Sequence, residues 1–166
     1  MLLDLREILD LPGGKIPFDF EMDMSMFRFE GVKEFLTPVS VSGQVENRAG
    51  MLTLEARLTC ELTCVCARCL KEFPKHLALR TYCFLAEELQ DEDNVDIYIL
   101  DHGCADLDEI AGTAFVLSME QRFLCSEDCR GLCPKCGKDL NDGPCDCKDE
   151  GDPRLAVLGQ LLEKED

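Results

Sequence analysis

The sequence predicts an α+β fold, in which an antiparallel, barrel-like β-sheet is followed by a helix, a cysteine-rich zinc knuckle and a C-terminal helix. Three observations predict it. Apolar and polar residues alternate up to about residue 100, helical periodicity appears only after residue 105, and cysteines crowd between residues 125 and 147. We therefore expect a mainly β region over 1–104, and the helices and knuckle over 105–166, integrated into one domain.

The β region is expected to begin after a short helical or irregular lead-in, residues 1–14, which ends in Pro12-Gly13-Gly14. Period-two alternation then predicts strands whose apolar faces form one side of a sheet. A turn over 47–50 predicts that the second and third of these strands pair as a hairpin. The expected strands cover residues 18–26, 39–46, 52–66, 77–85 and 95–100.

Two helices are expected in the second half of the chain. Asp106 and Glu109 form a capping box for the first helix, which has Ile110, Ala114 and Leu117 on its apolar face and extends for about four turns to Phe123. The second helix begins where an aspartate cap precedes a proline at the first helical position. Its start and its apolar face comprise Asp152, Pro153, Leu155, Leu158, Leu161 and Leu162.

Acidic residues dominate the charge of the chain. Asp and Glu number 34 against 17 Lys and Arg, which gives a formal net charge of −17 at pH 7. Such a surface repels phosphate backbones, so it disfavours non-specific nucleic-acid binding and favours basic partners. The absence of Trp and the presence of only two Tyr disfavour a broad base-stacking platform. The acidic run over 87–96 is either a solvated loop or a dock for a basic partner.

The chain contains twelve cysteines, which suit either disulfides in an oxidising compartment or metal in a reducing one. The N-terminal residues carry acids and no basic leader, unlike a secretory signal. No apolar stretch approaches the roughly 20 residues that a membrane-spanning helix requires. We therefore expect a cytoplasmic protein with reduced thiols that are available for zinc.

The cysteines of the knuckle form the strongest motif. Cys133-Pro134-Lys135-Cys136-Gly137 predicts a tight turn whose backbone N–H groups point at thiolate sulfurs. The segment is too polar to fold alone, so metal-coupled folding around structural zinc is expected. An iron–sulfur cluster is less favoured, because the cysteine spacing matches neither standard ferredoxin motif. A redox cysteine pair is the weaker alternative. The candidate ligands, four for one closed site and two to spare, are Cys125, Cys129, Cys133, Cys136, Cys145 and Cys147.

A second group of cysteines lies near the end of the long expected strand. Cys60, Cys64 and Cys66 occupy its core-facing positions, which is typical of small buried residues. Cys66 and Cys69 have the spacing of a metal-binding pair but need two further ligands, so the sequence leaves a second metal site open. The isolated Cys83 and Cys104, and the two histidines, receive no role.

Catalytic motifs are not evident. The sequence has no Gly-rich phosphate loop, no nucleophile elbow and no His-Glu pair at helical spacing, so we expect a protein that is not an enzyme.

Two cysteine motifs carry a resemblance to a known family. The segments Cys66-Ala-Arg68-Cys69-Leu70 and Cys125-Ser-Glu-Asp-Cys129-Arg-Gly-Leu-Cys133-Pro-Lys-Cys136-Gly, with Asp152-Pro153-Arg154-Leu155 beyond them, resemble the bacterial and plastid YceD family. The resemblance implies a ribosome-biogenesis factor that supports accumulation of the large-subunit (23S) ribosomal RNA. As a signature residue of that family, Arg68 is expected to contact a partner; by its chemistry alone, it would instead neutralise adjacent thiolates or an acidic neighbour.

Three hypotheses for function follow. The first is a non-enzymatic assembly factor that holds a basic ribosomal protein for the large ribosomal subunit, because the acidic surface suits such a partner. The second is a direct RNA binder that uses the basic residues of the knuckle. The third, which rests only on the number of cysteines, is a thiol redox or metal-storage protein. The basic residues in question are Arg130, Lys135, Lys138 and Lys148.

Overall fold

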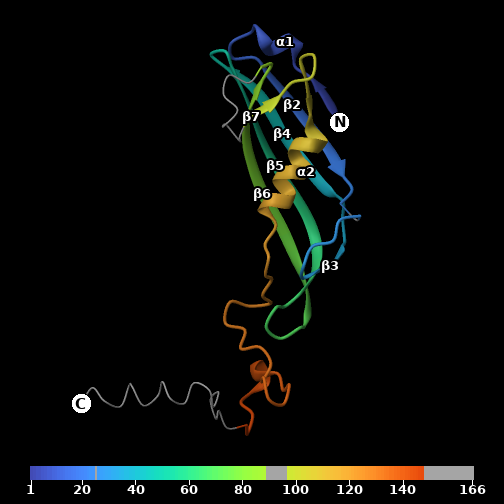
Figure 1. Ribbon diagram of the computed structural model, residues 1–166, viewed down its shortest axis with the longest axis vertical. Coiled ribbons are helices and arrows are strands. Elements are labelled where there is room, and N and C mark those ends of the chain that lie inside the picture. The colour runs from blue at the N-terminus through green and yellow to red at the C-terminus, as the bar shows by residue number, and fades with distance from the viewer. Residues whose placement is uncertain (25, 89–96, 148–166) are drawn as a thin grey trace, which may run out of the picture.

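A six-stranded sheet dominates the computed structural model, which describes residues 1–24, 26–88 and 97–147 (Figure 1). Its main path follows the order β2-β4-β5-β6-β7, and β3 pairs with β5 beyond the end of β4. All pairings are antiparallel except β6–β7, which is parallel. The strands are β2 (Lys15–Met22), β3 (Val32–Phe35), β4 (Val39–Arg48), β5 (Met51–Val65), β6 (Glu72–Ala86) and β7 (Ile97–Ile99).

The chain outside this sheet contributes short elements and one longer helix. Strand β1 (Leu2–Asp4) pairs with β8 (Cys104–Asp106), which ties the N-terminal residues to the start of helix α2 (Leu107–Ser118). The remaining elements are α1 (Arg6–Leu9) and the 3-10 turn η1 (Leu140–Asp142). Within the described ranges, no helix is both long enough and apolar enough to cross a membrane.

The expected β4–β5 hairpin and the returning strand β6 are confirmed. Their alternating side chains form the core: Leu52, Leu54 and Leu58 of β5 are at most 5% exposed and face α2. Gly43 is required in β4, because a Cβ there would lie 2.2 Å from the carbonyl oxygen of Glu55.

The expectation of a barrel-like sheet is wrong: the sheet is open, with β2 and β7 at the ends of its main path. Helix α2 lies across its apolar face (Figure 1), so that face is buried without closure of the strands. The strand expected over 18–26 ends at Met22, because its partner β4 begins opposite that residue, at Val39.

Helix α2 differs from its prediction in length and in orientation. Asp106 caps its start, accepting from the N–H groups of Asp108 and Glu109, as the motif predicted. The helix ends at Ser118 instead of near Phe123, and Phe123, beyond the helix, is completely buried in the core. The core-facing residues are Leu107, Ile110, Ala111 and Phe115, whereas Leu117, expected on the apolar face, is 79% exposed. The expected C-terminal helix, from 152 onward, and most of the acidic run lie outside the described residues.

A buried asparagine fixes the α1 end of the sheet. Asn47, at the end of β4, is 1% exposed. Its side-chain amide donates to the carbonyl oxygens of Ile8 (2.7 Å) and Leu9 (2.8 Å), and its Oδ1 accepts from the N–H of Gly50 (2.8 Å). Both ends of the amide are therefore satisfied, and they join α1 to the β4–β5 turn.

Candidate metal centres

The long β5–β6 hairpin carries the first cysteine pair to the far end of the molecule. Each strand has 15 residues, which corresponds to a length of about 50 Å. Cys66 and Cys69 lie in the turn that follows β5, and the turn projects beyond the part of the sheet that α2 covers (Figure 1). The sequence pattern indicated this pair but not its ligand partners.

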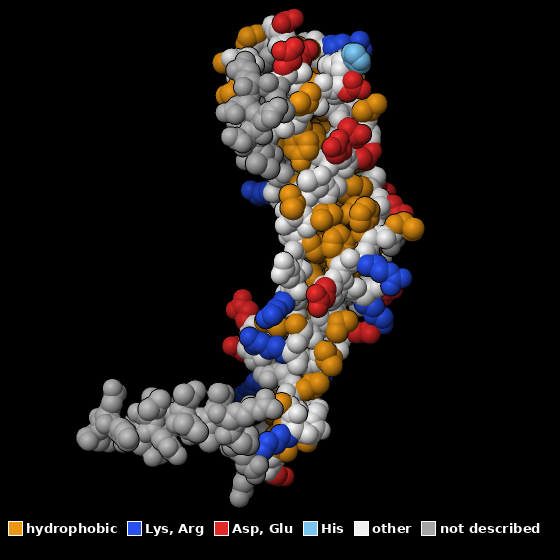
Figure 2. Space-filling view, viewed as in Figure 1, with side chains coloured by type: hydrophobic (Ala, Val, Ile, Leu, Met, Phe, Trp, Pro, Cys, Tyr) orange, Lys and Arg blue, Asp and Glu red, His pale blue; other side chains and the backbone are white. Residues whose placement is uncertain are grey.

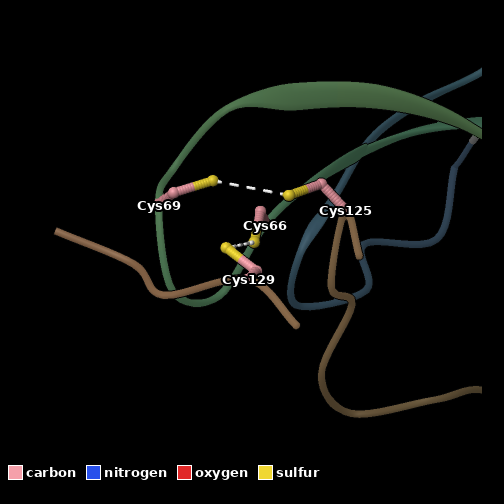
Figure 3. Close-up of side chains that lie close together, drawn as sticks. All are labelled: Cys66, Cys69, Cys125 and Cys129. Carbon is pink, nitrogen blue, oxygen red and sulfur yellow. Dashed lines mark hydrogen bonds between the residues drawn. The ribbon is translucent and has the colours of Figure 1, made fainter. Parts of the chain in front are cut away.

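The missing ligands come from the chain after α2. Residues 119–123 form neither a helix nor a strand, and the carbonyl oxygen of Phe123 accepts from the N–H of Ala67, just beyond β5 (2.8 Å). This contact brings Cys125 and Cys129 against the turn (Figure 3). The first cluster therefore consists of Cys66, Cys69, Cys125 and Cys129, whose sulfurs all lie within 4.8 Å of one another.

The sulfur spacing in the first cluster suits a tetrahedral metal ion. The Sγ atoms of Cys66 and Cys129 are 3.7 Å apart, and those of Cys69 and Cys125 are 3.6 Å apart (Figure 3). Zinc–sulfur bonds of about 2.3 Å in tetrahedral geometry place sulfurs about 3.8 Å apart. A disulfide would require about 2.0 Å, and none of the twelve cysteines forms one. The donor set therefore fits a zinc-type ion with little rearrangement.

A second cluster uses the remaining knuckle cysteines. The sulfurs of Cys133, Cys136, Cys145 and Cys147 also lie within 4.8 Å of one another. Thus the six C-terminal thiols do not form one group of four with two to spare. Two of them complete the first cluster, and four form the second. Each group of four could bind a metal ion such as zinc.

The two Cys-x-x-Cys turns share one backbone geometry. In the first turn, the N–H of Leu70 donates to the carbonyl of Cys66 and the N–H of Cys66 donates to Lys71, both at 2.9 Å. In the second turn, Gly137 and Cys133 make the equivalent bonds at 2.9 and 2.8 Å. Leu70 and Gly137 hold the same position with positive φ values of 59° and 73°. The sequence predicted this conformation for the glycine but gave no signal for the leucine.

Backbone N–H groups favour the charged form of one thiol in each cluster. Burial opposes ionisation of Cys66, but the N–H of Cys125 and those of two residues in its own turn donate to the sulfur and lower its pKa to about 6. The N–H groups of Cys136 and Lys135 lower the pKa of Cys133 to about 6 in the same way. The tight turn predicted the donors to Cys133; the donors to Cys66 were not predicted.

Neighbouring thiols oppose full ionisation of each cluster. Interaction with Cys69 raises the pKa of Cys125 to about 12, and interaction with Cys136 raises that of Cys147 to about 12. Four thiolates this close repel one another, so they require a cation to be charged together. The electrostatics therefore agree with the sulfur spacing.

Cys60 and Cys64, the other members of the strand-end group, are core residues. They are 3% and 0% exposed and lie in the main core, not in either metal cluster. Burial raises the pKa of Cys60 to about 11 and also raises that of Cys64. Both thiols are therefore neutral and suited to packing, as their alternation along β5 predicted.

Arg68 holds the two segments of the first cluster together. Its guanidinium donates to the carbonyl oxygens of Cys129 (2.8 Å) and Glu127 (3.2 Å), and its own carbonyl accepts from the N–H of Leu132 (3.1 Å). A Cβ on Gly131 would lie 2.9 Å from that carbonyl oxygen, so a glycine is needed at this approach. Arg68 therefore supports the ligands through their backbone.

Asn141 and Asp139 join the second cluster to the first. The Asn141 amide donates to the sulfur of Cys129 (3.4 Å), and its Oδ1 accepts from the N–H of Arg130 (2.8 Å). Asp139 pairs with Lys71 at 2.8 Å, and this lysine, followed by the N–H of Asn141, lowers the pKa of the carboxyl. The spacing of the cysteines gave no signal for these contacts.

The fold is an open sheet with one four-thiol group at the end of its longest hairpin and a second in the segment that follows. These features define a class of cysteine-rich protein that could bind two metal ions. Residues 54–162, which include both clusters, match the family described as "Large ribosomal RNA subunit accumulation protein YceD". The chain belongs to the YceD family, which gives it a ribosome-related role at the level of the family.

Two curated relatives are described only as uncharacterized proteins. YlbN of Bacillus subtilis (strain 168) is 27% identical over 166 residues, which cover 98% of this chain and 96% of the relative. ML1660 of Mycobacterium leprae (strain TN) is 26% identical over 136 residues, which cover 79% of this chain and 62% of the relative. No solved structure matches the chain.

Proposed function

We propose that the protein is a non-enzymatic assembly factor that supports accumulation of 23S ribosomal RNA by holding a basic protein of the large ribosomal subunit. The family match over 54–162 carries the ribosomal part of this proposal. The net charge of −17 supports the choice of partner, because so acidic a chain attracts a basic protein and repels RNA phosphates. Its place of action would be the cytoplasm, where thiols stay reduced.

Each cluster is assigned one zinc ion with a structural role. Four thiolates close the coordination sphere, which leaves no position for a water or a substrate, and this supports a function other than catalysis. The ion in the first cluster would join the β5–β6 turn to the segment after α2. The chain itself supplies the positioning groups, namely the turn amides, Arg68 and Asn141.

Zinc would also explain the order of the cysteine-rich segment. Within the described part of this segment, 124–147, the buried side chains are those of two ligands, Cys129 and Cys133. Leu124 and Leu132 pack only partly against the first cluster. Because so little apolar surface is buried, coordination is the main source of folding free energy available to the segment.

Depletion of the protein tests the proposal. The ratio of large-subunit to small-subunit ribosomal RNA should fall, and expression of the wild-type chain should restore it. Capture of the tagged whole chain at low salt should recover basic large-subunit proteins. An unchanged RNA ratio, or capture that yields neither a ribosomal protein nor precursor RNA, would contradict the proposal.

Direct RNA contact is a second candidate, because Arg130, beside a ligand of the first cluster, and Lys135 and Lys138, beside ligands of the second, are exposed. Lys148, the fourth cation of this hypothesis, lies outside the described residues. This version predicts that RNA affinity falls steeply with salt, and that joint replacement of the described three by alanine abolishes binding. RNA affinity that is insensitive to salt would exclude it. A redox or storage role instead predicts thiols that react readily in the metal-loaded protein.

A further inference from the structure

The outer side of α2 carries an exposed apolar groove. Val116 and Leu117 of the helix are 44% and 79% exposed, and Phe27, which faces them from the chain after β2, is 53% exposed. These three side chains line a groove of about 370 Å³. Figure 2 shows apolar side chains gathered over this part of the molecule, with acidic side chains along the border of the patch. Contiguous exposed apolar surface of this kind marks interaction sites.

A glycine in the middle of α2 keeps the groove open. Gly112 lines it, and a Cβ built there would meet only Met22 Sδ, at an ordinary contact distance of 3.9 Å. Glycine within a helix costs about 1 kcal/mol relative to alanine. Packing within the described residues does not require this glycine, so its lack of a side chain serves the groove rather than the fold.

The opposite wall of the groove is anchored to the core. The ring of Phe27 stacks on that of Phe29, with centroids 6.5 Å apart. Phe29 makes an edge contact at 5.8 Å with the ring of Phe115, which is fully buried. Phe27 is thus held in place beside the helix, and a wall that is already ordered lowers the entropic cost of binding a partner.

Charge selects the kind of partner. Asp108 and Glu109, in the first turn of α2, line one end of the groove. The N-terminal ammonium of Met1 already pairs with Asp108, so Glu109 is the carboxylate offered to a partner. The rest of the chain adds to this field, since its net charge is −17. A second copy of the chain would bring the same charge and be repelled, whereas a segment with lysine or arginine beside its apolar residues would be attracted.

We propose that the groove formed by Phe27, Gly112, Val116 and Leu117 binds an amphipathic segment of a basic protein. Apolar side chains of that segment lie over Gly112 between Phe27 and Leu117, and a cation of the segment faces Glu109. The inference rests on the proposed function only in taking the partner to be a ribosomal protein.

Titration of the whole chain with a defined peptide tests this surface. The probe is a fluorescent 18-residue peptide of leucine, lysine and alanine, with leucines on one helical face and lysines on the other. Leu117→Asp should weaken binding at least about tenfold, since it removes an exposed leucine that the bound peptide would cover and puts a carboxylate in its apolar site. Met51→Asp, at a 59% exposed site on the β4–β5 turn, is the matched control and should change binding less than twofold.

A third variant separates binding from folding. Gly112→Ala should raise the midpoint of unfolding and yet weaken peptide binding, because the methyl group enters the groove. The proposal is overturned if Leu117→Asp and Met51→Asp have equal effects, if a scrambled peptide binds equally well, or if the stabilised Gly112→Ala variant binds as tightly as wild type. A wild-type dimer that Leu117→Asp dissociates would also overturn it.

Sedimentation with large-subunit precursors distinguishes this inference from the proposed function. Wild-type co-sedimentation without peptide binding would overturn the groove assignment alone. Peptide binding to the groove without co-sedimentation would support the groove and contradict the ribosomal function.

Discussion

Addition of a chelator to the metal-loaded protein should release two ions at different rates, from the second cluster first. Three of the four thiols in the first cluster are buried, whereas in the second only Cys133 is buried. A chelator must reach the sulfurs or wait for local opening, so exposure sets the order of release. The structure therefore predicts a fast and a slow phase of equal amplitude, each corresponding to one ion per chain.

Serine substitutions assign the phases to the clusters. Cys136→Ser should abolish the fast phase and Cys69→Ser the slow one, because each removes one ligand of a closed four-thiolate site. Cys60→Ser is the matched control: this thiol is buried in the sheet core, so both phases should persist. The assay records zinc released to a chromogenic chelator against time.

Two results would refute this reasoning. A single phase in the wild type, with amplitude of one ion, would show that the clusters do not bind separately. Loss of both phases in the single variant Cys136→Ser would show that metal binding at the first cluster depends on the second. That result would contradict the claim that the first cluster has four ligands of its own.

Three further predictions concern the supports of the fold and site. Arg68→Ala should accelerate amide exchange over 124–130, because the carbonyl oxygens of Glu127 and Cys129 lose their donor; protection equal to wild type would exclude this role. Asn47→Ala should lower the free energy of unfolding by about 3 kcal/mol, since three hydrogen bonds of a buried side chain are lost; a loss below about 0.5 kcal/mol in a urea titration would contradict it. Leu70→Gly should raise the free energy of unfolding by about 1 kcal/mol, because the positive φ of 59° strains leucine. Destabilisation in the same urea titration would show that the leucine side chain stabilises the turn.

The β4–β5 hairpin and its partner β6 could be predicted because the determining signals are local. Alternation fixes which face of β5 is buried, and the turn at 47–50 fixes the register of the pair. Closure of the sheet could not be inferred in this way. It depends on whether α2 covers the apolar face, and that is a tertiary contact.

The end of α2 was mispredicted for a related reason. Met119 and Phe123, four positions apart, continue a helical pattern, but the backbone there is not helical; Phe123 is buried and its carbonyl oxygen accepts from the N–H of Ala67. Tertiary packing thus overrides local periodicity. The outward orientation of Leu117 follows from burial of Phe115 on the opposite side of the helix.

The chemistry of the metal sites was predictable, but the assignment of ligands was not. Spacing identifies Cys66 and Cys69 as a pair in need of two ligands, but nothing in the spacing names Cys125 and Cys129, which lie more than 50 positions away. That pairing arises because the hairpin and the segment after α2 end at the same place. Arg68 and Asn141 take their roles from this same junction.

Metal content per chain is the most direct test of two separate four-thiolate sites. The whole protein is purified without added metal and its mass is measured under native conditions, before and after treatment with a chelator. The account predicts two zinc ions per chain, both lost on chelation, with all twelve cysteines reduced. A chain that holds one ion or none while the cysteine-rich segment keeps its fold, or a mass that shows disulfides among these cysteines, would contradict it.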